Sequence, residues 1–93
     1  MTPSQLINKS VIITKIADID DYKGEPVHSK VGDIFRGRVI EFFNVATDNT
    51  PGKLILRERK FLLKRNISFY ITSFNSADLL FDTESSRYGI TII

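Results

Sequence analysis

Seven basic residues and one tyrosine in the middle of the chain are the side chains whose types and spacing could do chemistry. Guanidinium groups grip phosphate oxygens through paired hydrogen bonds, ammonium groups attract phosphates as point charges, and aromatic rings stack on bases. This combination predicts binding of single-stranded nucleic acid. The residues that we expect to carry it are Arg36, Arg38, Arg57, Arg59, Lys60, Lys64, Arg65 and Tyr70.

The spacing of the arginines favours a common surface. Arg36 and Arg38 are two residues apart, as are Arg57 and Arg59, and alternate residues of a strand face the same side of a sheet. If the two segments are neighbouring strands, all four arginines share one face. Two other interpretations stay open. The charges could form a solvated face that protects an edge strand from aggregation and is partly matched by acids, or they could bind an acidic protein.

Charge is distributed unevenly along the 93 residues. The net charge is +2, but residues 36–65 carry +5, whereas residues 1–33 carry −1 and residues 66–93 carry −2. A basic centre between slightly acidic ends indicates an anionic partner more strongly than the net charge does.

Other reactive residues give weaker signals. The chain has no cysteine, which excludes disulfides, thiolate nucleophiles and cysteine-bound metals, and His28 is its only histidine. We interpret His28 as an exposed loop residue in preference to a metal ligand or general base. The first residues of a calcium-binding loop are suggested by Asp18, Asp20 and Asp21. Lys23, however, occupies the position where that loop needs glycine.

No nucleophile elbow, catalytic triad or glycine-rich phosphate loop is present in the sequence. We therefore predict a non-enzymatic protein without cofactor or metal. The length fits a single domain, residues 1–93. No apolar run is long enough to span a membrane, and the first ten residues lack a signal-peptide pattern, so we expect a cytoplasmic location and no membrane partner.

Alternation and turn residues predict short strands. We expect strands in residues 11–16, 31–45, 67–74 and 88–93, with Gly37 marking a bulge or a barrel corner. Turn formers in residues 46–52 should join two antiparallel neighbours. Residues 1–9 are expected to be a loose lead-in.

Two segments are harder to interpret. Residues 54–65 are rich in helix formers, but their apolar positions spread too widely round a helical wheel, so we favour a strand at 54–56, an irregular or briefly helical charged link, and an extended segment from Phe61. Asn75 and Asp78 favour the start of a helix of one or two turns.

These elements predict an all-β fold, or a β-rich fold with one short helix, arranged as a small antiparallel five-stranded barrel or rolled sheet. The sequence Val31-Gly32-Asp33 followed by Gly37-Arg38-Val39 resembles the opening strands of barrels of the oligonucleotide-binding type. That resemblance covers only residues 31–39 and implies that an OB-like topology is possible.

A second function fits the same small chain. It could be an accessory or inhibitor subunit that pairs through an exposed sheet edge with another protein or with a second copy of itself, using the apolar strand 88–93. Among the aromatics we expect four phenylalanines in the core and three tyrosines at the surface. These are Phe35, Phe43, Phe69 and Phe74, and Tyr22, Tyr70 and Tyr88.

Overall fold

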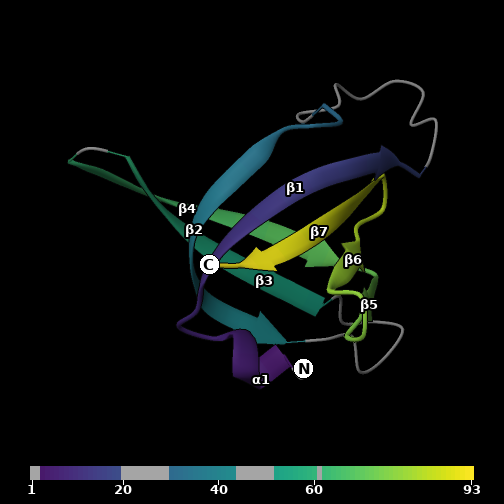
Figure 1. Cartoon of the computed structure of the whole chain (residues 1–93), viewed down its shortest axis with the longest axis horizontal. Helices are drawn as coiled ribbons and strands as arrows, with labels where there is room; N and C mark the ends of the chain where they lie inside the picture. The colour runs from purple at the N-terminus through teal and green to yellow at the C-terminus, as the bar shows by residue number, and fades with distance from the viewer. Residues whose placement is uncertain (1–2, 20–29, 44–51, 61) are drawn as a thin grey trace.

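A computed structural model describes residues 3–19, 30–43, 52–60 and 62–93. In this part of the chain one antiparallel sheet contains all seven strands, and a four-residue helix precedes it (Figure 1). The elements are α1 (Pro3–Leu6), β1 (Ser10–Asp18), β2 (Ile34–Phe43), β3 (Gly52–Lys60), β4 (Leu63–Ile71), β5 (Ser73–Asn75), β6 (Leu80–Asp82) and β7 (Ser86–Ile92). The predicted all-β class with one short helix is confirmed.

The sheet is rolled. Its strand order is β4-β3-β2-β1-β7-β6-β5, so β4 and β5 lie at opposite ends, yet only Thr72 separates them along the chain. The two ends must therefore meet, and the rings of Phe69 in β4 and Phe81 in β6 are 5.4 Å apart between centroids. No ladder joins β4 to β5 among the described residues. The rolled sheet is thus observed, and the closed five-stranded, OB-like barrel is not.

The inner face of the roll holds the core. Alternate residues of β1, β3 and β4 are buried, as the period of two requires. Leu6 of α1 is also fully buried, and the Asn8 amide donates to the Val39 carbonyl at 2.6 Å. The expected loose lead-in is therefore ordered from residue 3, because an apolar side chain fixes it against the sheet.

A bulge in β2 changes which aromatic residues are buried. Ile40 is an extra residue between the pairs Val39–Leu56 and Glu41–Ile55, so the faces exchange after Val39. Phe42 therefore points into the core and Phe43 is 41% exposed, which reverses our expectation for Phe43. Of the two roles predicted for Gly37, a bulge or a barrel corner, the bulge is wrong, because the register with β1 is regular through Gly37 and the bulge lies three residues later.

Two tyrosines of the predicted surface set are described. Tyr70 is 57% exposed, as predicted, but Tyr88 is buried against Phe69 and Phe81. The sequence could not show this burial, because it results from the rolling of the sheet. Tyr22 lies outside the described residues.

The charged residues after Leu56 continue strand β3, so the expected irregular or helical link was wrong. Arg57 pairs with Asn66, Glu58 with Arg65 and Arg59 with Lys64 across the β3–β4 ladder. Cross-strand pairing therefore overrides the helix propensity of this segment. The last buried position of β3 is Leu56, and the hairpin extends beyond it away from the body of the molecule (Figure 1).

The expected second helix is a turn. The Asn75 side-chain oxygen accepts hydrogen bonds from the amides of Ala77 and Asp78 at 3.0 and 3.2 Å, so the predicted cap forms. Residues 76–79 then turn from β5 into β6, with Leu79 at a φ of 53°. The terminal strand β7 lies between β1 and β6 and is not a sheet edge.

Candidate nucleic-acid interface

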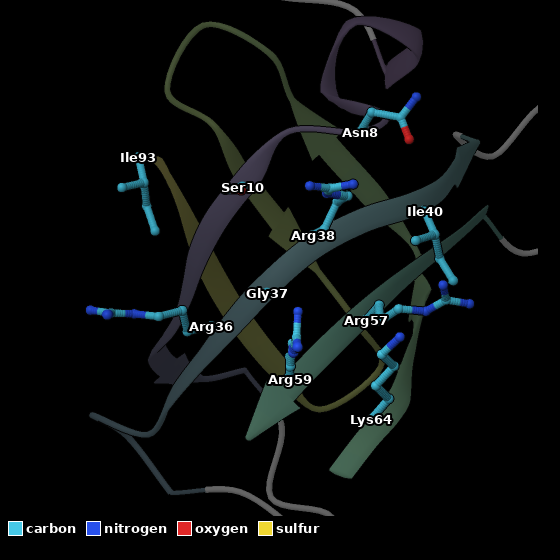
Figure 2. A pocket seen from close by; sticks show the side chains of 10 residues that line it. All are labelled: Asn8, Ser10, Arg36, Gly37, Arg38, Ile40, Arg57, Arg59, Lys64 and Ile93. Atoms are coloured by element: carbon cyan, nitrogen blue, oxygen red, sulfur yellow. The ribbon is translucent and has the colours of Figure 1, made fainter. Parts of the chain in front are cut away.

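Five of the predicted cations line one groove on the outer face of the sheet, which we call the cationic groove (Figure 2). Its cations are Arg36 and Arg38 of β2, Arg57 and Arg59 of β3, and Lys64 of β4. The groove has a volume of about 660 Å³. Its other lining residues are Asn8, Ser10, Gly37, Ile40 and Ile93.

Strand register brings these cations together. β2 and β3 are neighbours, as the arginine spacing requires, and Arg38 is directly opposite Arg57. On the next ladder Arg59 is directly opposite Lys64. Like charges that face each other across a ladder destabilise a sheet. Two such pairs on adjacent ladders therefore concentrate positive potential at a cost to stability.

Gly37 allows the backbones to approach at the centre of the groove. A Cβ at this position would collide with the carbonyl oxygen of Arg57 on β3. Every other residue type has a Cβ, so a substitution here would push β2 away from β3. Gly37 thus fixes the spacing between the Arg36/Arg38 pair and the Arg57/Arg59 pair.

Neither Glu41 nor Glu58 neutralises the groove in the described part of the chain. Glu58 accepts a hydrogen bond from Arg65 at 2.9 Å, and its neighbours Arg57 and Arg59 alternate to the other face. Glu41 is exposed opposite Ile55 and does not line the groove. The ion pairs found among described residues include none of the five groove cations.

Three predicted site residues lie elsewhere. Arg65 forms the ion pair with Glu58 and does not line the groove. Tyr70 is farther along the outer face of β4, where the ammonium of Lys53 lies 5.7 Å from its ring centroid. The side chain of Lys60 is outside the described part. Of the eight predicted residues, the structure brings together Arg36, Arg38, Arg57, Arg59 and Lys64.

Figure 2 shows how the groove side chains lie. Arg38 stands at the centre, whereas Arg36 extends away from the other four cations. Asn8 lies just before β1 and Ser10 is the first residue of β1, opposite Arg38 in the register. Sequence reasoning missed these two polar residues, because nothing in their local pattern links them to β2.

The structure gives no metal or catalytic site, among the described residues, for the histidine and aspartates that the sequence analysis considered. His28, Asp20 and Asp21 lie outside the described residues. Asp18 is described and forms an ion pair with the buried Lys15 at 2.7 Å. Within the described ranges no three acidic or histidine side chains gather as metal ligands.

A search of the described helices for a membrane-crossing candidate gives none, since α1 has four residues. Comparisons with protein-family models, curated proteins and solved structures found no match to this chain.

Proposed function

We propose that this protein binds single-stranded nucleic acid through the cationic groove. The observation that carries the proposal is the pair of opposed like charges, Arg38–Arg57 and Arg59–Lys64. Such an arrangement weakens the free sheet and is relieved when anions lie between the cations. Four of the five groove cations are arginines, which bind phosphate oxygens in a bidentate manner.

The surroundings of the groove favour a single strand over a duplex. The outer face is a sheet surface that continues along β4 to the exposed ring of Tyr70. Lys64 and Tyr70 are six residues apart on that face, about 20 Å at the usual rise of a strand. An extended oligonucleotide can place phosphates on the cations and stack a base on the ring of Tyr70. In a duplex the bases are paired and stacked with each other, so their faces cannot reach this ring.

Charge reversal at Arg59 tests the proposal. Arg59→Glu places a carboxylate opposite Lys64, so we expect the affinity for a labelled mixed-sequence oligonucleotide to fall roughly tenfold or more. For every phosphate that the variant no longer neutralises, the slope of log affinity against log salt should also become shallower by about 0.7. Fluorescence anisotropy at several salt concentrations measures both quantities.

The matched control is Lys30→Glu, which makes the same change in charge at an exposed position outside the groove. It should alter the affinity much less. Equal losses for the two variants would mean that net charge alone attracts the oligonucleotide. Absence of binding by the unmodified protein at low salt would refute the proposed function.

A second candidate function, pairing with a protein through a sheet edge, is favoured by one observation. In the described part of the chain the nine-residue strand β4 has β3 on one side and no strand on the other. An unpaired strand of this length can add a further strand. The edge in question is β4, since β7 is internal.

A further inference from the structure

A second pocket opens beside the free edge of β4. It has a volume of about 590 Å³ and lies between β4 and residues 83–85, which connect β6 to β7. Its aromatic wall contains Phe35, Phe69 and Tyr88, whose ring centroids are 5.1 to 6.4 Å apart. This volume is within the range of small-molecule sites, and apolar rings with few polar groups are typical of them.

The polar groups of this pocket divide into two kinds. Thr72, Thr83 and Ser85 use their hydroxyls in the turn itself, where Thr72 donates to the Asp82 carbonyl and Thr83 accepts from the Ser86 amide. The Glu84 carboxylate and the Ser68 hydroxyl have no such bond among the described residues. Both groups can therefore take part in recognition.

The pocket lies farther along β4 than the cationic groove, and the two share no lining residue. Its aromatic wall belongs to the inner face of the roll, whereas the groove is on the outer face, so a strand that reaches both passes over the free edge of β4. Lys64 lines the groove, whereas Ser68 and Tyr70 on the same face line the pocket. Lys64 and Ser68 are four residues apart, about 13 Å along a strand. Lys53 is opposite Tyr70 across the β3–β4 ladder, and its ammonium lies over the Tyr70 ring, so a further cation stands beside the pocket on the outer face.

We propose that the pocket accepts one base of the bound strand and prefers cytosine to thymine or uracil. This inference rests on the proposed function. Phosphates stay on the groove cations, because Glu84 repels them from the pocket. The base packs against Phe35 and Ile67, the half-buried apolar residues of the lining, since Phe69 and Tyr88 are buried. The exocyclic amino group of cytosine donates to Glu84, whereas thymine and uracil present a carbonyl oxygen at that position, which a carboxylate repels.

Oligonucleotides of equal length test the preference. At neutral pH and moderate salt we expect oligo(dC) to bind the unmodified protein roughly tenfold more tightly than oligo(dT). Glu84→Gln should bring this ratio close to one, since an amide can both donate and accept. Glu41→Gln, the same change at an exposed carboxylate outside the pocket, should leave the ratio unchanged.

Amide NMR shifts locate the base independently of affinity. Titration with oligo(dC) should shift the amides of Ser68 and residues 83–85. Equal affinity for the two oligonucleotides, or an unchanged ratio in Glu84→Gln, would overturn the pocket assignment. If Arg59→Glu still weakened binding in that case, the proposed function of the groove would stand without the pocket. If no oligonucleotide bound at low salt, the proposed function and the pocket assignment would both be refuted.

Discussion

Arg59 and Arg65 lie in the same hairpin, β3–β4, but they have different surroundings because they face opposite sides of the sheet. Arg65 faces Glu58 and is neutralised at 2.9 Å, whereas Arg59 faces Lys64 and meets only positive charge. An exposed pair such as Arg65–Glu58 contributes little to stability. The like-charged pair opposes stability, and the proposed function would account for its presence.

A different arginine affects the pH dependence of stability. Arg87 donates hydrogen bonds of 2.8 and 3.1 Å to the two carboxylate oxygens of Asp82. These bonds hold the pKa of Asp82 below its usual range, with the positive charge of Arg87 adding to the effect. Depression of a carboxyl pKa on folding means that the native state binds fewer protons at this site than the unfolded state.

We therefore expect Arg87→Gln to lower the melting temperature at neutral pH. The stabilisation from Asp82 is present above the pKa of its unfolded form and is lost as the pH falls through its native pKa. The melting temperatures of the variant and the unmodified protein should thus converge in acid, as thermal unfolding monitored by circular dichroism would measure. Lys9→Gln, at an exposed cation, should give no such convergence. A pH-independent difference for Arg87→Gln would contradict the assignment.

At the level of elements, the β3–β4 hairpin supplies three of the five groove cations and also forms one edge of the sheet. It ends in Leu62 and Leu63, which are 96% and 78% exposed, beside Lys64 and Arg65. Charged side chains on an edge strand are a common means of preventing edge-to-edge pairing. The cations of this hairpin can therefore keep copies of the chain apart as well as attract phosphate.

On this basis we expect the protein to be a monomer at low and moderate salt. Two β4 edges that paired would join two cationic outer faces into one sheet, and their repulsion opposes this. Sedimentation velocity over a range of concentrations measures the association. A dimer that appeared only at high salt would agree with charge as the cause, since salt screens exposed charges. A stable dimer at low salt would favour the edge-pairing function instead.

At the level of the whole molecule, contacts between strands far apart in the sheet order hold the roll together. Phe69 of β4 contacts Phe35 of β2, Phe81 of β6 and Tyr88 of β7 in edge-to-face geometry, at 5.1 to 5.6 Å between centroids. Aromatic pairs of this geometry add to the free energy gained from burial. The cationic groove lies on the outside of a surface whose curvature these inner contacts fix.

Phe69→Ala should accordingly destabilise the fold by about 3–5 kcal/mol, because apolar burial is lost and a cavity is left. The matched control is Phe43→Ala, because Phe43 is 41% exposed and should cost much less. Urea unfolding of the two variants measures the difference. Equal free energies of unfolding would show that Phe69 does not hold the roll.

The sequence by itself determined the strand-rich class, the alternation of β4 and the placement of the arginines in pairs that can share a face, because these depend on local periodicity and local charge. It could not locate the bulge at Ile40, and so it misassigned Phe43. Only the tertiary structure decided that Tyr88 is buried and that Arg65 forms an ion pair while Arg59 faces Lys64. It also decided that Ser10 lines the groove and Glu84 the pocket. Those outcomes depend on register and on the rolling of the sheet, which bring together residues that are distant in the chain and leave no trace in the pattern of any one segment.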